Sequence, residues 1–164
     1  MAAAPMKLFT IGFTQKSLRQ FMGLLRDAAV DGVVDIRLNN TSQLAGFAKR
    51  DDLAFILDTC GIGYCEEKRL APTPAILDAY HRDHDWNAYE PAFRALLAGR
   101  DPAAILSGIE ARFERPCLLC AEPEPSRCHR RLVAEAFAAL RPNLEVRHLV
   151  LERPAKGSRQ QAAQ

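Results

Sequence analysis

The sequence predicts a single three-layer α/β domain with a mostly parallel sheet of about five strands flanked by helices. Two observations predict this fold. Short apolar runs lack polar alternation, as expected for strands that are buried on both faces, and helical patterns lie between successive runs. The length of 164 residues fits one domain with its own core. We assign the domain to residues 7–152 and expect the ends, residues 1–6 and 153–164, to be disordered.

Five apolar runs are expected to form the strands of this sheet. They are Leu8–Phe13, Gly32–Leu38, Ile62–Glu66, Pro116–Glu122 and Glu145–Val150. Ligands bind beyond the carboxyl ends of the strands in parallel sheets of this kind. The residues that end these runs are therefore the first place to look for a functional site.

Helices are expected between the strands. Ser17 is placed to cap the first helix. Asp51 or Asp52 is expected to open the second, which ends at Gly61. The remaining helical segments are expected near Ala75–His81, Asn87–Leu97 and Ala103–Phe113, and from Ser126 to about Leu140.

Composition and charge argue against several classes of protein. Apolar residues make up 48% of the chain and charged residues 26%, a balance typical of a globular domain. The net charge of +2 does not indicate non-specific nucleic-acid binding, which usually needs a larger basic excess, although a local basic patch stays open. No stretch approaches the roughly 20 apolar residues that cross a bilayer. The start of the sequence lacks a charged region followed by an apolar run, so we expect no secretory signal. The five cysteines are an odd count, and we expect reduced thiols and a cytoplasmic protein.

The end of the fourth strand and the helix after it form the most informative segment. The strand is expected to end near Cys120, a loop with two prolines follows, and Ser126 is placed to cap the helix. Cys128 and His129 then fall in the first helical turn. Both continue the inner stripe of the helix towards Cys120, whereas Arg130 is expected to point more sideways.

This arrangement predicts a reactive thiol. A cysteine at a helix N-terminus can have a lowered pKa, and an adjacent imidazole can act as its base. We therefore take Cys128, His129 and Glu122 as the candidate catalytic residues. The alternative is that Cys120 and Cys128 are small buried hydrophobic residues and that His129 only binds a backbone group. Cys117 is expected in the core, on the opposite face of the strand from Cys120.

Other uses of the same residues stay open. Cys120, Cys128 and His129, with a fourth ligand such as Cys65, form a possible zinc or iron site, and the cysteines form a possible redox pair. A phosphate cradle is disfavoured because the loop is rich in prolines and glutamates. His81 and His84 are better explained as a solvated helix end than as metal ligands. The aromatic residues Trp86, Tyr89 and Phe93 are expected in the core.

A charged pair is expected at the end of the second strand. Asp35 lies inside an apolar run, where an unpaired carboxylate is costly. Arg37, two residues further on, points to the same face and is one possible partner. Together with Cys120 and Arg130 they are the candidate ligand-binding residues.

Three motifs carry a resemblance to a known family. Cys-Ala-Glu-x-x-Pro-x-x-Cys-His-Arg-Arg, from Cys120 to Arg131, occurs together with Phe-Thr-Ile-Gly near the start and Val-Asp-Ile-Arg in the second strand. Over roughly residues 7–150 the chain resembles the domain of unknown function 488 family. The resemblance implies an α/β fold and implies that all the candidate site residues above match positions of family motifs. Two positions depart from the pattern: Phe13 stands where the family has a histidine, and Leu70-Ala71-Pro72 stands where it has a Leu-Gly pair.

The sequence therefore favours an enzyme or ligand-binding domain that acts on a small polar or nucleotide-like molecule at the strand ends. A non-catalytic nucleic-acid or protein-binding module and a metalloprotein are the alternatives. The sequence names no cofactor, substrate or partner.

Overall fold

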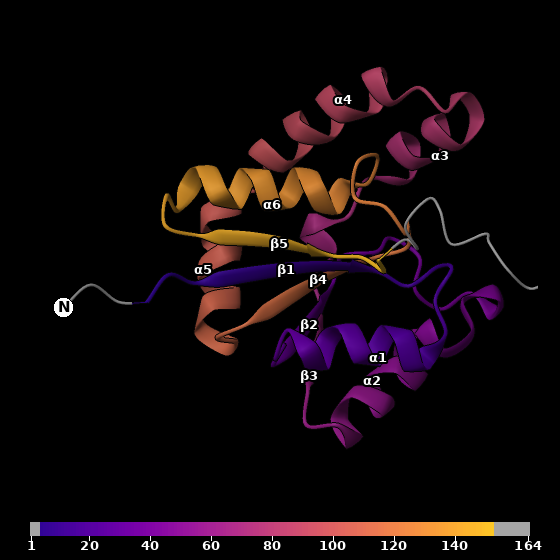
Figure 1. The fold of residues 1–164 in the computed structure, drawn as a ribbon. Coiled ribbons are helices and arrows are strands. Elements are labelled where there is room, and N and C mark those ends of the chain that lie inside the picture. Colours follow the sequence, from indigo (N-terminus) through magenta and orange to yellow (C-terminus); the bar gives the residue numbers. More distant parts are fainter. Residues whose placement is uncertain (1–3, 153–164) are drawn as a thin grey trace, which may run out of the picture.

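Five parallel strands form one sheet at the centre of the molecule (Figure 1). This computed structural model describes residues 4–152, apart from the side chains of residues 43 and 44. The strands are β1 (Lys7–Gly12), β2 (Gly32–Asp35), β3 (Gly63–Glu66), β4 (Pro116–Cys120) and β5 (Glu145–Leu149). Their order in the sheet is β3-β2-β4-β1-β5. The predicted α/β class and parallel sheet are confirmed, while the terminal residues 1–3 and 153–164, which belong to the ends predicted to be disordered, lie outside the described residues.

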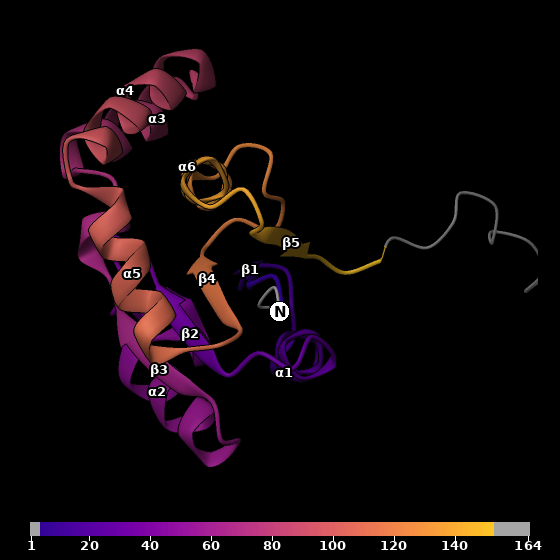
Figure 2. The ribbon, with the colours of Figure 1, turned by 90° about the vertical axis from the view of Figure 1, so that its left-hand side faces the viewer.

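Within residues 4–152, six α-helices cover the two faces of the sheet. They are α1 (Leu18–Asp27), α2 (Arg50–Thr59), α3 (Pro74–Asp83), α4 (Trp86–Ala98), α5 (Pro102–Arg112) and α6 (His129–Leu140). Helices α1 and α2 cover one face, and α5 and α6 cover the other, where α3 and α4 pack further out (Figures 1 and 2). None of the helices in residues 4–152 is long and apolar enough to cross a bilayer.

Each face of the sheet has its own hydrophobic core, because neighbouring residues of a buried strand point in opposite directions. In β4, Cys117 and Leu119 pack with α1 and α2, whereas Leu118 packs with α4, α5 and α6. Cys117 is fully buried and lies on the face opposite Cys120, as predicted. Burial on both faces explains why the strand sequences show no alternation.

The direction of the connections changes between β1 and β4. The chain leaves β1 through α1, on one face, and leaves β4 through α6, on the other. These two strands are neighbours, and Gly12 is paired with Cys120 at their carboxyl ends. Adjacent strands that send their helices to opposite faces mark the edge of the sheet where ligands commonly bind in α/β folds. The cavity described below lies at this edge but is lined by no residue of β1.

Two strands are shorter than predicted, ending at Asp35 and Cys120 rather than at Leu38 and Glu122. Asp35 accepts a hydrogen bond from the backbone N–H of Arg37, at 3.1 Å, so its side chain turns the backbone at the end of β2. The other three strands agree with the prediction to within one residue at each end.

Of three predicted helix starts, one is confirmed and two are wrong. Ser17 caps α1 and forms a capping box, as predicted. Helix α2 begins at Arg50 and not at the two aspartates that follow it. Helix α6 begins at His129, so Ser126 is not its cap. The N–H of Cys128 instead bonds to the carbonyl of Pro125, at 3.2 Å, and this extra turn delays the helix.

Candidate functional site

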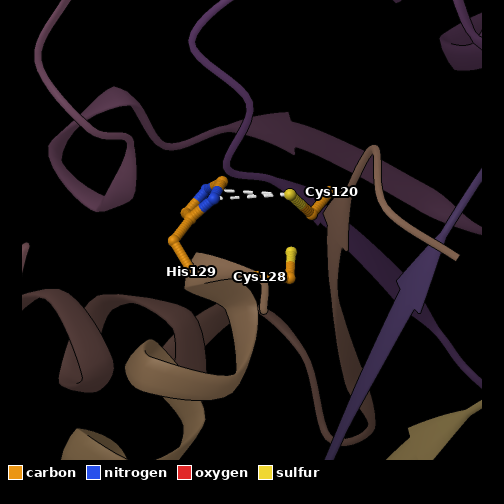
Figure 3. A group of neighbouring side chains, drawn as sticks. All are labelled: Cys120, Cys128 and His129. Atoms are coloured by element: carbon orange, nitrogen blue, oxygen red, sulfur yellow. Dashed lines mark hydrogen bonds between the residues drawn. The ribbon is translucent and has the colours of Figure 1, made fainter. Parts of the chain in front are cut away.

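Cys120, Cys128 and His129 meet at the carboxyl edge of the sheet (Figure 3). Cys120 ends β4, Cys128 is the N-cap of α6, and His129 is the first residue of that helix. All three are buried, and their two sulfur atoms and a ring nitrogen lie within 4.8 Å of one another. Residues that are eight and nine positions apart in the sequence thus form one compact cluster, as the sequence predicted.

The orientation of the His129 ring is fixed by the backbone of the second strand. Its Nε2 atom lies 2.8 Å from the carbonyl oxygen of Ile36. A carbonyl oxygen can only accept, so Nε2 carries the proton and Nδ1 presents its lone pair. Nδ1 lies 3.4 Å from Sγ of Cys120. The ring also packs against Phe93, with 5.4 Å between centroids, and Nδ1 is the nitrogen that faces the sulfur of Cys120.

The two thiols of this cluster differ in acidity. Burial raises the pKa of Cys120 well above its ordinary value, and the adjacent Cys128 raises it further. Burial also opposes ionisation of Cys128, but Cys120, His129 and Arg130 outweigh it and hold the pKa of Cys128 well below its ordinary value. The position of Cys128 at the N-terminus of α6 favours the same charge. Of the two thiols, Cys128 is therefore the one that loses its proton more readily.

Arg130 is buried under the cluster, where the helical pattern had predicted a sideways orientation. It donates from Nε to Oγ1 of Thr10, at 3.2 Å, and from its two terminal nitrogens to the carbonyls of Glu122 and Pro123. Thr10 in turn contacts Nδ1 of His148, at 2.6 Å. The loop after β4 has carbonyls without strand partners, and a buried guanidinium satisfies them. Arg130 thus positions the loop and adds positive charge beside Cys128.

Gly12 allows this loop to lie against the end of β1. A Cβ atom at this position would lie 1.7 Å from the carbonyl oxygen of Glu122. Only a residue without a side chain fits there. The sequence alone gave weak grounds for this role, since a lone glycine has many explanations.

Asp35 and Arg37 form the predicted pair. Nε and Nη2 of Arg37 donate to the two carboxylate oxygens, at 2.9 and 2.8 Å. Asn40 and Tyr64 also donate to this carboxylate. Burial raises the pKa of Asp35, but Arg37 and Tyr64 outweigh it, so the net effect lowers that pKa. Asp35 lies behind Arg37 and does not line the cavity described next.

A cavity of about 220 Å³ opens above the cluster. Its floor contains the three cluster residues, and one wall is aromatic, from α3 and α4. The residues that line it are Arg37, Leu38, Asn39, Pro72, Leu77, Tyr80, His81, Trp86, Tyr89, Cys120, Ala121, Glu122, Arg127, Cys128 and His129. Glu122 is exposed at the rim, and Arg127 is a lining residue that the sequence did not single out.

The aromatic wall was only partly predicted. Tyr89 and Phe93 belong to the hydrophobic core, as expected, but Trp86 and Tyr89 also line the cavity. Trp86 and Tyr89 stack with 5.0 Å between ring centroids, and Tyr80 lies 5.9 Å from Trp86. The i, i+3 spacing of Trp86 and Tyr89 predicts that they touch each other, but not which surface they share.

Three further residues that were weighed as metal ligands lie apart from the cluster. Cys65 is half-buried against the hydrophobic core, and within residues 4–152 it is not part of a group of potential metal ligands. Within the same range, neither His81, which lines the cavity, nor His84, which is the C-cap of α3, is part of a group of potential metal ligands.

A family model described as Domain of unknown function DUF488 matches residues 17–137. The chain belongs to this family. The matched range includes the whole Cys120, Cys128 and His129 cluster, whereas β1 and β5 lie outside it. No curated protein and no solved structure matches the chain.

The two departures from the DUF488 pattern both adjoin the site. The ring of Phe13, which stands where the resemblance implies a histidine, lies 5.2 Å from Cζ of Arg37. Pro72, in the second departure, lines the cavity. Phe13 itself does not line the cavity, and His129 is the imidazole next to the thiols.

Proposed function

We propose that this protein is an enzyme in which the Cys128 thiolate attacks a small polar substrate and His129 acts as the general base. The observation that carries the proposal is the fixed tautomer of His129. Its Nε2–H is held by the Ile36 carbonyl, so Nδ1 is free to take a proton from the thiol pair. An imidazole with both nitrogens bonded to the backbone could not act as a general base.

The surroundings of Cys128 support the same chemistry. Cys120 can donate its S–H towards the thiolate, because its own pKa is raised by burial and by the neighbouring charge. Arg130 supplies positive charge from a buried position. A polarised thiol pair next to an imidazole, at the floor of a cavity, is an arrangement typical of nucleophilic catalysis.

The cavity favours a small substrate with a flat part. Its volume of about 220 Å³ is small for a ligand site, and its lining combines an aromatic wall with polar groups that fix orientation. Trp86 and Tyr89 offer a surface for a ring, as in a nucleotide-like molecule. Glu122 at the rim and Arg37 on the wall supply an acceptor and a donor for polar substituents.

A zinc or iron site is the second candidate, and a specific observation favours it. Histidines that bind metals commonly donate their other ring N–H to a backbone carbonyl, as His129 does to Ile36. Two cysteine sulfurs and one imidazole nitrogen are also the ligand set of a catalytic zinc with an open fourth position. In this alternative Cys128 is a ligand and not a nucleophile.

One preparation of the protein separates these candidates. It is purified without chelator under reducing conditions, and metal content and site-resolved labelling by iodoacetamide are measured in the wild type and in Cys128→Ser. Cys60→Ser is the matched control, because Cys60 lies at the end of α2, away from the cavity. The proposal expects no stoichiometric metal and labelling of Cys128 ahead of the other cysteines.

Two other results would reject the proposed nucleophile. Stoichiometric zinc or iron that is lost in Cys128→Ser but kept in Cys60→Ser would establish the metal site instead. An inert Cys128 without metal, together with a loss of stability in Cys128→Ser, would favour the non-catalytic binding module, in which the motif only holds the fold together.

A further inference from the structure

Arg37 is held rigidly by groups that point away from the reactive cluster. Two of its side-chain nitrogens bind Asp35 in a bidentate arrangement. The carboxylate also accepts from Tyr64, at 2.6 Å, from Asn40, at 3.3 Å, and from the backbone N–H of Arg37. Because Asp35 is fixed from several sides, the plane and direction of the guanidinium are fixed as well.

The third nitrogen of this guanidinium has no protein partner. The side chain is only 3% exposed, and Nη1 is a buried atom without a hydrogen bond in the part of the chain that the structure describes. A buried N–H donor that is left unpaired costs about 1–3 kcal/mol. Such an unpaired donor needs an explanation. One explanation is that its hydrogen-bond partner is a ligand.

The position of Arg37 indicates which ligand. Arg37 lines the same cavity as Cys120 and Cys128. Asp35 already neutralises its charge, and Glu122 stands at the rim, so a highly charged phosphate is a poor fit. The available N–H instead suits one oxygen that is neutral in the substrate and gains charge during the reaction.

We infer that Nη1 of Arg37 binds the carbonyl oxygen of the substrate, and that the reaction is acyl transfer from a flat, ring-bearing ester or amide. The inference rests on the proposed role of Cys128 and adds the class of substrate to it. Trp86 and Tyr89 would hold the ring, and the carbonyl carbon would lie between Arg37 and Cys128. Nη1 is buried in this structure, and the inference requires a neighbouring side chain to move aside when the oxygen binds.

The chemical steps balance with the groups present and water. His129 Nδ1 takes the thiol proton, the thiolate forms a bond from Sγ to the carbonyl carbon, and the π electron pair of the carbonyl moves onto its oxygen beside Arg37. This pair then re-forms the carbonyl as the bond to the leaving oxygen or nitrogen breaks, and the leaving group receives the proton from His129. Water, deprotonated by the same nitrogen, attacks the thioester, and the acid leaves as the Cys128 thiol is restored.

Two probes that differ in the carbonyl test this inference. p-Nitrophenyl acetate is a flat ester, and its acylation of Cys128 is followed by p-nitrophenolate release and by the mass of the modified peptide. Methyl methanethiosulfonate modifies the same thiolate but offers no carbonyl. In Arg37→Lys, which removes Nη1, we expect the acylation rate to fall about tenfold or more, since one donor to such an oxygen is worth up to roughly 10²–10³. The rate with the thiosulfonate should change by less than about twofold.

Arg69→Lys is the matched control for the loss of a bidentate arginine pair outside the site. Nε and Nη2 of Arg69 donate to the two carboxylate oxygens of Glu67, as Arg37 does to Asp35, but Arg69 does not line the cavity. Both rates should stay within about twofold of the wild type in this variant. Equal losses with both probes in Arg37→Lys, or no loss with either, would overturn the inference.

The wild type separates failure of the inference from failure of the proposed function. If Cys128 reacts rapidly with the thiosulfonate but its acylation is no faster than that of Cys60, the proposed nucleophile stands and the role of Arg37 is wrong. If Cys128 reacts with neither probe faster than Cys60, the proposed function itself is wrong.

Discussion

Nε2 of His129 lies 2.8 Å from the carbonyl oxygen of Ile36, which joins the first turn of α6 to the residue that follows β2. This single hydrogen bond determines which nitrogen of the imidazole faces the cysteines. It also brings the ring to 3.4 Å from the sulfur of Cys120. The chemistry of the site therefore depends on a contact between two elements that lie 93 residues apart in the chain.

Replacing His129 by alanine should slow the alkylation of Cys128. Removal of a general base typically lowers a rate by roughly 10²–10⁴, so a fall of at least about tenfold is expected at neutral pH. Iodoacetamide labelling followed by peptide mass spectrometry measures it. His84→Asn is the control, because His84 ends α3 with a left-handed backbone that asparagine tolerates. A Cys128 rate that is unchanged in His129→Ala would remove the histidine from the mechanism.

Gly12→Ala should destabilise the fold and disturb the site. The new Cβ would lie 1.7 Å from a backbone oxygen, so the loop after β4 has to shift, and we expect a loss of about 2 kcal/mol or more in the free energy of unfolding. Gly23→Ala is the matched control, since nothing lies within 4 Å of its Cβ position in α1. That change should be neutral or stabilising by up to about 1 kcal/mol. Urea unfolding compares the two, and equal effects would refute the close approach of the loop.

Arg130→Met should cost far more stability than Arg131→Met. Arg130 is fully buried, and its removal leaves the carbonyls of Glu122 and Pro123 without a donor. A loss of about 3 kcal/mol is expected for these hydrogen bonds. Arg131 is partly exposed and pairs with Glu135, at 2.8 Å, a type of contact worth less than about 1 kcal/mol. Similar unfolding free energies for the two variants would contradict the buried role of Arg130.

Asp35 should make stability depend on acidic pH. Burial raises its pKa, but the hydrogen bond and charge of Arg37 outweigh it, so the folded-state pKa lies below the ordinary 3.8. A lowered pKa contributes stability that is fully present above the unfolded value and is lost as the pH falls through the folded value. Asp35→Asn should lose about 3–5 kcal/mol at neutral pH, because it leaves Arg37 unpaired.

The pH dependence provides the check on that prediction. The free energy of unfolding of the wild type, measured with urea, should decrease as the pH falls below 3.8, and this part of the decrease should be absent in Asp35→Asn. Tyr64→Phe keeps the carboxylate and should therefore show the same decrease as the wild type. The same acid profile in the wild type and in Asp35→Asn would show that this carboxylate is not responsible.

Much of the fold could be predicted because it depends on local patterns. Buried strands have few polar residues, and helices between them repeat their apolar residues at fixed spacing. The same logic placed Cys128 and His129 at the start of a helix beside the end of β4. It failed for Arg130, since helical geometry gives a direction but does not reveal that the loop carbonyls of Glu122 and Pro123 need a donor.

The cavity wall depends on contacts between elements that are distant in sequence, so no local pattern could predict it. The aromatic residues of α3 and α4 face the site only because α4 packs on α6. In the same way, the pairing of Asp35 with Arg37 follows from burial, but the free Nη1 atom of Arg37 follows only from the bidentate geometry.

The pH dependence of Cys128 alkylation tests the central claim most directly. Site-resolved iodoacetamide rates are measured from acidic to alkaline pH, with Cys65 as an internal reference, since burial raises the pKa of that thiol. The account predicts that the Cys128 rate reaches half of its plateau well below pH 9.0, the ordinary thiol value, and that this midpoint rises in His129→Ala. A Cys128 rate that increases only at or above that pH, together with Cys65, would contradict an activated thiolate and the proposed function with it.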